Sequence, residues 1–414
     1  MLSFIKKLDG RSRALLYTCF FAFFCSGALT LTIGSTIPDL KAAYGLSDTL
    51  SGLFLSAYSA GNLAAGFVGG LIPLYLGQRK SIMLLSALGY AGFLMMIVWG
   101  NPVWLFLAFV LTGLGRGSVS NFDNRMVNIL SGGSPAASNL LHASFAMGAI
   151  AAPMIFLAMS TAAGWRAGLC GVIALGTVSV VRLGRMRLED DRPSRTDKVN
   201  STLSFLKNPS FLIQGMMMLC YLCSEFAISG WLVTYIQSKT ELLSAFGRTA
   251  QAQQAGAAAY SQSMATLLWT VILAGRLTCA ALSARFSQKK LLLAASVGVA
   301  LFFGMMLLSG TIPLVTASVA GLGFCMAGIS PMIYSDAAAF TNAYPLATSA
   351  LLCFGSSGAI LMPVVVGAVA ERFGFTGGMS AIYITVALLV VFATLNITVK
   401  PRKPCQEAHD AIHA

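Results

Sequence analysis

Long apolar segments alternate with short polar connections along the whole chain. About twelve segments of 20 or more predominantly apolar residues can be marked, with approximate limits 14–37, 47–73, 81–100, 103–129, 136–162, 164–184, 209–236, 256–284, 289–309, 312–341, 344–371 and 375–399. A helix needs about 20 such residues to cross the hydrocarbon core of a bilayer, and the longer segments should tilt or extend beyond it. The pattern predicts an all-α membrane protein with 12 transmembrane helices.

The longest clearly polar connection, at residues 185–208, divides these segments six and six. We therefore expect an N-terminal six-helix bundle over 1–184, a cytoplasmic linker over 185–208, a C-terminal six-helix bundle over 209–399 and a cytoplasmic tail over 400–414.

Short motifs of the first half recur in the second at a nearly constant offset. The motif Gly77-Gln78-Arg79-Lys80 recurs 210 residues later as Ser287-Gln288-Lys289-Lys290. At the same offset, the stretch 148–153 recurs as 358–363, and Gly164-Trp165 matches Gly374-Phe375. The stretch 113–115 matches 321–323 at an offset of 208. Because each half has six segments, both halves share one orientation, which predicts two six-helix halves related by a pseudo-two-fold axis along the membrane normal.

The basic residues are distributed unevenly between the two sets of connections. With the N-terminus inside, 20 Lys and Arg residues fall on the cytoplasmic side and five on the other, while Arg116 and Arg276 lie within segments. Short cytoplasmic loops of membrane proteins carry an excess of Lys and Arg. This bias predicts that both termini are cytoplasmic, in a protein of the plasma (inner) membrane.

Composition excludes several other classes of protein. The chain is 57% hydrophobic and 10% charged, whereas a soluble domain carries about 25% charged residues. The net charge of +13 comes from basic loops, which fits orientation in a lipid bilayer and not nucleic-acid binding. Phosphate-loop, zinc-protease and nucleophile-elbow motifs and metal-spaced Cys/His clusters are absent from the sequence, which argues against an ATP-driven pump or a membrane hydrolase. We expect no enzyme activity, no cofactor, no metal, and a monomer.

Segment 103–129 carries a polar stripe although it is apolar enough to cross a bilayer. Within about 100° of one helix face lie Gly113, Gly117, Ser120, Asn121, Asn124 and Asn128. Beside them, Arg116, Ser120 and Asp123 form a second stripe. Polar groups at membrane depth normally face a bundle interior or a wet cavity, and glycines allow another helix or a ligand to come close. This helix either lines a polar path through the membrane or uses these residues to hold helices together.

Over its whole length the sequence resembles the major facilitator superfamily. The stretch 70–80, ending in Gly77-Gln78-Arg79-Lys80, is similar to that superfamily's signature loop, with Leu74 where the family usually has an aspartate. The resemblance implies a transporter that works by alternating access, with substrate held between the two halves near the midplane.

Within the superfamily, the sequence is most similar to the fucose/galactose/glucose:proton symporters and the related glucose-transporter-like proteins. The resemblance is carried by Gly113-x-Gly115-x-Gly117, Asn124, the run from Asn139 through His142 to Pro153, Glu225, Trp231, Tyr235, Gly275-Arg276 and Pro331. At two positions where members of the group carry acidic residues, this chain has Ser120 and Gly34. The resemblance implies proton-coupled sugar transport.

Two charged residues lie near the middle of predicted segments. Arg116 could hold an anionic substrate group, pair with Glu225 or form another structural ion pair. Glu225 lies in the middle of the first predicted helix of the second half. A carboxyl group at that depth can take up and release a proton. The alternative is that Glu225 is a fixed partner of Arg116 or Arg276.

Further titratable residues lie closer to the predicted cytoplasmic side. Arg276 is about 9 Å from the midpoint of its segment at 1.5 Å per residue, and Asp123 and Asp336 are at similar depth. A pair between Arg276 and one of these carboxylates could close the cytoplasmic side in one state, which gives Arg276 and Asp336 gating roles; Asp123 is a second candidate for proton coupling. His142 titrates near physiological pH and could contact substrate or form a hydrogen-bonded helix contact.

Neutral polar residues complete the predicted substrate site. Asn62, Asn121 and Asn124 offer both hydrogen-bond donors and acceptors, as sugar hydroxyls require. Trp231 could stack on a sugar ring or pack in a helix interface. The predicted substrate-binding residues are Asn62, Arg116, Ser120, Asn121, Asn124, His142 and Trp231.

These features predict a secondary active transporter that takes up a sugar or another small polar solute together with H⁺. A transporter or exchanger of small organic anions, such as carboxylates or sugar acids, is the alternative favoured by Arg116, Arg276 and His142. Multidrug efflux is a third possibility, against which the polar stripe argues. A membrane sensor or an intramembrane enzyme is a fourth, and neither a soluble signalling domain nor a catalytic constellation supports it.

Overall fold

The computed structural model describes residues 8–132, 135–186, 204–282, 285–344 and 347–398, and in these residues the chain is helical, without strands. Eleven of the described helices are long and apolar enough to cross a membrane. One of them is the 52-residue helix α15 (Ala347–Thr398), which contains two of the predicted segments and has non-helical dihedral angles at Gly374. The prediction of an all-α protein with about twelve spanning segments is therefore confirmed.

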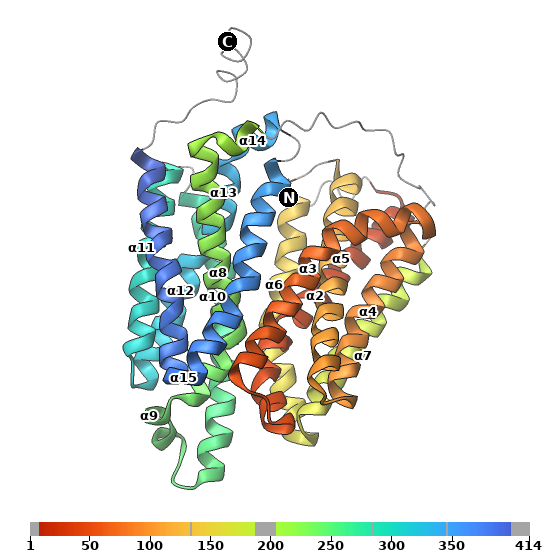
Figure 1. Cartoon of the computed structure of the whole chain (residues 1–414). Helices are drawn as coiled ribbons and strands as arrows, with labels where there is room; N and C mark the ends of the chain where they lie inside the picture. The colour runs from red at the N-terminus through yellow and green to blue at the C-terminus, as the bar shows by residue number, and fades with distance from the viewer. Residues whose placement is uncertain (1–7, 133–134, 187–203, 283–284, 345–346, 399–414) are drawn as a thin grey trace. The chain divides into compact units, whose positions relative to one another are not determined.

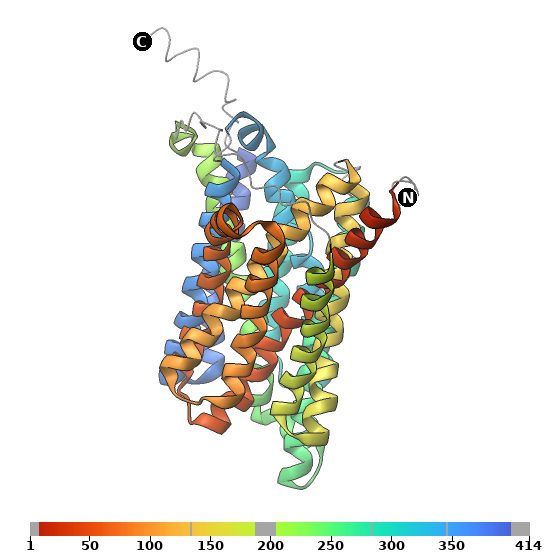
Figure 2. The same cartoon turned by 90° about the vertical axis from the view of Figure 1, so that its right-hand side faces the viewer.

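The first half contains six long helices. They are α2 (Gly10–Tyr44), α3 (Asp48–Leu76), α4 (Gln78–Val98), α5 (Pro102–Ser131), α6 (Pro135–Ala163) and α7 (Trp165–Arg185), drawn from red to yellow in Figure 1. Seen from the side, they run alongside one another over most of their lengths (Figure 2).

Local sequence explains where these helices begin and end. The side chain of Asp9 accepts hydrogen bonds from the backbone N–H groups of Arg11 and Ser12 and caps α2, and hydrogen bonds from Ser12 and Arg11 lower the pKa of the Asp9 carboxyl. Helix α2 ends at Gly45, which has φ of 63° and adopts the left-handed conformation that glycine tolerates best. Asn101 caps α5, with Pro102 in the first turn, where its missing N–H costs nothing.

The second half is more interrupted. It contains α8 (Pro209–Ser238), α10 (Ala250–Leu282), α11 (Gln288–Leu308), α12 (Ile312–Met326), α13 (Ile329–Asp336), α14 (Ala338–Ala343) and α15, with the short elements η1 (Ser204–Lys207), α9 (Thr240–Leu243) and η2 (Ser244–Phe246). The predicted segment 312–341 is thus divided between α12, α13 and α14.

The chain divides into two compact units. Unit 1 is Met1–Arg195 with Ser229–Thr270, and unit 2 is Thr196–Ile228 with Val271–Ala414. Helices α8 and α10 therefore contribute residues to both units. Most of the predicted linker, 185–208, and the predicted tail, 400–414, lie outside the described residues, and the predicted bundle limits stay predictions.

Glycines allow close helix packing inside unit 1. A Cβ atom at Gly113 of α5 would collide with the backbone carbonyl of Tyr58 in α3, and one at Gly61 of α3 would collide with that of Val110 in α5. Without side chains at these positions, the two backbones approach to van der Waals distance, as is common for small residues between membrane helices.

Gly113→Ala is expected to destabilise the protein by about 1–3 kcal/mol, because the added methyl group overpacks a rigid backbone contact. Gly66→Ala is the matched control on α3, since a Cβ atom there meets nothing within 4 Å. That control should be neutral or slightly stabilising, because alanine favours helix over glycine by about 1 kcal/mol. Thermal unfolding in detergent measures both; equal melting temperatures would refute the close packing at Gly113.

The internal repeat is visible in contacts as well as in sequence. In unit 1, Gly148 of α6 packs against the backbone of Phe24 and Ala28 in α2. In unit 2, its sequence match Gly358 of α15 packs against the backbone of Leu219 and Cys223 in α8. Matched glycines thus serve matched helix contacts, which supports the repeat read from the sequence.

The basic motif after each half's second span makes an equivalent contact in both units. Arg79 donates a hydrogen bond to the carbonyl of Gly184, near the C-terminal end of α7. Lys289 Nζ donates to the carbonyl of Asn396, 2.7 Å away near the end of α15. Cationic side chains near helix C-termini bind the unpaired carbonyls and oppose the helix dipole. These residues therefore hold the last helix of each half, a role that does not require the aspartate replaced by Leu74.

Candidate functional site

Arg116 is the central polar residue of unit 1. Its Nη1 donates a hydrogen bond to Asn62 Oδ1 of α3 at 2.8 Å. The guanidinium carbon lies 5.4 Å from the centroid of the Phe145 ring of α6, in cation–π contact. Its Nε is buried and has no hydrogen-bond partner among the described residues. The structure thus joins two predicted substrate residues, Asn62 and Arg116.

Glycines on α5 bring these groups together. Gly117 packs against the backbone and side chain of Asn62, and a Cβ atom there would crowd both. The close approach of α5 to α3 leaves the Arg116 side chain within reach of the Asn62 amide. The glycine stripe and the polar stripe predicted for this helix therefore act together.

Aromatic side chains lie beside the guanidinium. The Phe145 ring centroid is 5.5 Å from that of Phe23 and 5.7 Å from that of Trp269. Trp269 is 6% exposed, and its Nε1 has no hydrogen-bond partner among the described residues. Sequence reasoning missed Trp269, because nothing in its apolar surroundings sets it apart from an ordinary packing residue.

A second set of polar groups in unit 1 comes from residues 229–270 and α2. Gln262 Nε2 donates to the carbonyl of Ser35 at 3.2 Å, while Gln262 Oε1 is buried without a partner in the described part of the chain. The hydroxyl groups of Ser35, Ser229 and Thr234 are likewise buried without a hydrogen-bond partner among the described residues. These residues also escaped prediction, because isolated Ser, Thr and Gln residues are common in membrane helices.

The other predicted substrate residues do not gather at Arg116. Asn124 Nδ2 donates to the backbone carbonyl of Ser120 at 2.8 Å, within α5, and Asn121 is exposed. His142 is exposed on α6, with its ring 5.5 Å from that of Phe23. Trp231 is fully buried in α8. Their roles in binding stay predictions.

Asp123 lies in the interior of unit 1. It is fully buried, and the Cys19 thiol is the weak hydrogen-bond donor beside its carboxylate. Its titratable neighbours are Cys19 and Cys25 of α2 and Tyr90 of α4. A buried carboxylate with a weak thiol donor is costly, and the proton-coupling role of Asp123 stays a prediction.

Unit 2 contains a second charged cluster. The Tyr221 hydroxyl of α8 donates to the carbonyl of Met326 at 3.1 Å, where α12 ends. Glu225 lies one turn along α8 within hydrogen-bonding reach of that hydroxyl, and the charge of Arg276 also acts on it. Arg276 Nε is buried without a partner among the described residues. The predicted proton carrier and the predicted gating arginine therefore both act electrostatically on Tyr221.

Asp336, at the end of α13, has amide partners in this structure. Its Oδ2 accepts hydrogen bonds from Gln214 Nε2 and from Asn396 Nδ2, each at 2.9 Å. These contacts tie α13 to α8 and to the end of α15. A gating pair with Arg276 would require this arrangement to change, and the gating roles stay predictions.

Metal ligands do not gather in the part of the chain that the structure describes. It contains no group of three or more His, Cys, Asp or Glu side chains that could hold a metal ion.

Comparisons with known proteins agree with this architecture. The family model of the Major Facilitator Superfamily matches residues 19–250. Membrane protein MosC of Rhizobium meliloti is 26% identical over 389 residues, which cover 91% of this chain and 88% of that protein. Protein spinster homolog 1 of Xenopus laevis is 26% identical over 226 residues, covering 50% of this chain and 42% of that protein.

Solved structures show the same fold. The nucleoside transporter NupG is 16% identical and has a TM-score of 0.71, with 94% of this chain and 99% of that chain covered. An inward-facing, occupied bacterial homolog of the human lysosomal transporter spinster is 14% identical and has a TM-score of 0.72, with 95% and 98% covered. At these identities the likeness establishes the fold and leaves the substrate open.

Proposed function

Because this chain belongs to the Major Facilitator Superfamily, we propose that it is a secondary active transporter that takes up a small, hydroxyl-rich polar solute together with protons. Membership of the superfamily implies membrane transport by alternating access. We propose in addition the class of solute, the coupling ion and the direction of transport.

The observation that carries the proposal is the incomplete hydrogen bonding of Arg116. A guanidinium has five N–H donors, and Asn62 accepts from one of its terminal nitrogens. The buried Nε has no partner among the described residues. An unsatisfied buried donor costs about 1–3 kcal/mol, so an oxygen-rich solute that accepts from Arg116 would recover that free energy.

The surroundings of Arg116 suit a sugar ring. The Asn62 amide supplies a donor and an acceptor beside the guanidinium, and Phe145 and Trp269 offer apolar ring faces. Pockets for small molecules commonly combine apolar walls with a few such orienting polar groups. A nucleoside also contains a sugar ring, so uridine belongs among the solutes to test beside free sugars.

A small organic anion is the second candidate. Within unit 1, the ion pair of the described residues joins Lys41 to Asp48, whereas the hydrogen bond of Arg116 is made to the neutral amide of Asn62. A charged group in a membrane helix is costly unless it is compensated. A carboxylate on the solute would provide that compensation, which favours sugar acids among the hydroxyl-rich solutes.

We propose Glu225 as the proton carrier and an orientation with both termini cytoplasmic in the plasma (inner) membrane. Glu225 is half-buried and within hydrogen-bonding reach of Tyr221, on which the charge of Arg276 also acts; a movement of Arg276 toward or away from Glu225 would change the electrostatic environment of its carboxyl group. The orientation rests on the excess of 20 over five basic residues.

A solute panel tests the proposal directly. Purified full-length protein is expected to be stabilised by D-glucose, uridine or D-glucuronate at millimolar concentration, because a ligand that binds the native state raises the melting temperature. The stabilising solute should then accumulate in proteoliposomes under an inward pH gradient. Stabilisation by lipophilic cations alone, with no effect of these polar solutes, would contradict the proposal and favour multidrug efflux.

A further inference from the structure

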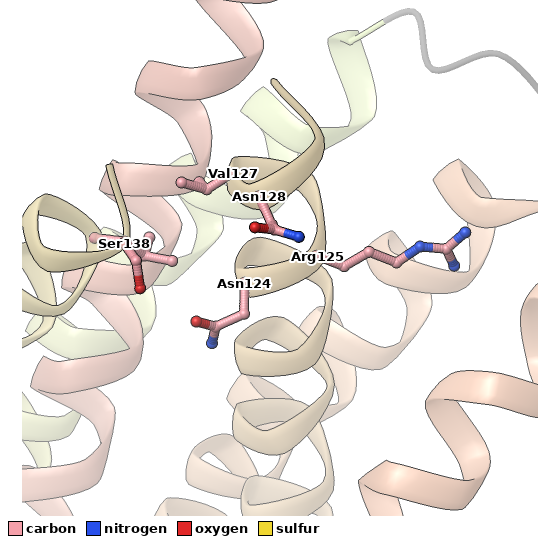
Figure 3. A pocket seen from close by; sticks show the side chains of 6 residues that line it. Asn124, Arg125, Val127, Asn128 and Ser138 are labelled. Atoms are coloured by element: carbon pink, nitrogen blue, oxygen red, sulfur yellow. The ribbon is translucent and has the colours of Figure 1, made fainter. Parts of the chain in front are cut away.

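A separate polar cavity lies between α5 and α6, away from Arg116. Its volume is about 270 Å³, and its lining includes Asn124, Val127 and Asn128 of α5 with Ser138 and Leu141 of α6. Figure 3 shows Asn124 projecting from α5 on the side of Ser138, whereas the guanidinium of Arg125, which also borders the cavity, extends to the opposite side.

The cavity continues the polar stripe of α5. Asn124 and Asn128 follow Arg116 by two and three helical turns, which places them about 12 and 18 Å further along the helix axis. A solute of sugar size cannot contact Arg116 and Asn128 at once across that distance. The cavity is therefore a site distinct from the Arg116–Asn62 cluster.

The lining suits neutral hydroxyl groups. Asn124 uses its amide nitrogen to bond Ser120, which leaves its side-chain carbonyl oxygen available as an acceptor. Asn128, with its side-chain amide, and Ser138, with its hydroxyl group, are both exposed. Val127 and Leu141 are almost completely buried and form an apolar floor. Amides and a hydroxyl on an apolar floor can bind a hydroxylated ring without a charge.

We propose that this cavity is a second binding site for the transported solute, which takes its neutral, hydroxylated part after the solute leaves Arg116. The inference rests on the proposed function, because it assumes that a hydroxyl-rich solute is transported. Since the Arg125 guanidinium points away, the second site distinguishes poorly between D-glucose and D-glucuronate, whereas Arg116 favours the acid.

Protection of a cysteine in the cavity tests the proposal. In full-length Ser138→Cys, alkylation of residue 138 is followed by mass spectrometry of the peptide that contains it, with and without D-glucose or D-glucuronate. At a concentration of twice its Kd, a bound solute should slow alkylation about threefold. Exposed Cys170 on α7 provides the internal control and should react at an unchanged rate.

Two further variants separate the cavity from the Arg116 site. Protection of residue 138 should persist when Arg116→Gln is added, because the cavity does not use the guanidinium. It should disappear in Asn128→Leu, which keeps a similar side-chain volume, while thermal stabilisation by D-glucuronate through Arg116 is retained. That retained stabilisation also shows that Asn128→Leu is folded.

The outcomes distinguish this inference from the proposed function. Stabilisation by a solute without protection of residue 138, or protection that vanishes with Arg116→Gln, would overturn the second site and leave the transporter proposal intact. Protection by inorganic phosphate and not by either sugar would assign the cavity to an anion and also overturn it. If neither sugar stabilises or protects the protein, both the proposed solute class and this site fail.

Discussion

In proteoliposomes, Glu225→Gln is expected to abolish solute accumulation driven by a pH gradient while exchange of labelled for unlabelled solute continues. Glutamine resembles a permanently protonated glutamate, so the loaded carrier can still reorient but can no longer release a proton. With one proton per solute, a gradient of one pH unit can drive about tenfold accumulation, since each factor of ten corresponds to about 1.4 kcal/mol. We expect that accumulation to fall to the level without a gradient.

The surroundings of Glu225 give the reason for choosing this carboxyl group. It is half-buried in α8 and within hydrogen-bonding reach of the Tyr221 hydroxyl, on which the charge of Arg276 also acts. A nearby guanidinium favours the ionised carboxylate, and removal of that charge favours the protonated acid. Alternating access can switch between these conditions, because the two states need not keep the same distance between Glu225 and Arg276.

A matched substitution controls for the loss of an acidic residue. Glu241→Gln changes an exposed glutamate in the short helix α9, outside the spanning helices, and should leave gradient-driven accumulation unchanged. If Glu225→Gln still accumulates solute under the gradient, Glu225 is not the proton carrier. Asp123 would then be tested next, although its closed surroundings make it the weaker candidate.

The fold could be predicted from sequence because the bilayer imposes a simple rule on it. Every spanning backbone must satisfy its own hydrogen bonds, so long apolar segments report helices reliably. Breaks in the helices were harder to predict: Gly374 has non-helical dihedral angles in α15, and α12 ends at Met326, within one predicted segment. These details depend on tertiary packing, which hydropathy does not record.

The candidate site was predicted in part, for an equally physical reason. A charged residue in an apolar segment is conspicuous, so Arg116 and Glu225 could be found from sequence alone. The Asn62 partner of Arg116 and the neighbouring Trp269 come from other helices, and their proximity depends on glycine packing and helix rotation. On α5, helical periodicity placed Asn121 on the polar stripe beside that of Arg116; Asn121 is exposed in the structure, and its role in binding stays a prediction.

Substitution of Arg116 is expected to have the second large effect, and its size depends on the solute. For a sugar acid, Arg116→Gln removes a charge-assisted hydrogen bond worth about 1.5–3 kcal/mol, which corresponds to roughly tenfold to more than hundredfold weaker binding. Arg116→Lys keeps the charge but loses the planar fork that binds a carboxylate through two hydrogen bonds. The affinity of Arg116→Lys for a sugar acid should therefore lie between that of wild type and that of Arg116→Gln.

For a neutral sugar the order of the two variants changes. Glutamine retains a hydrogen-bond donor and an acceptor for hydroxyl groups. Lysine places a strongly hydrated charge beside Phe145 and lacks the planar guanidinium that arginine uses to bond Asn62. Arg116→Gln should then bind D-glucose at least as well as Arg116→Lys. Isothermal titration of wild type, both variants and the exposed-site control Arg372→Gln with D-glucose and D-glucuronate measures the order. Unchanged affinity of both variants for every stabilising solute would remove Arg116 from the binding site, because a guanidinium that contacts the solute cannot be replaced by both lysine and glutamine without cost.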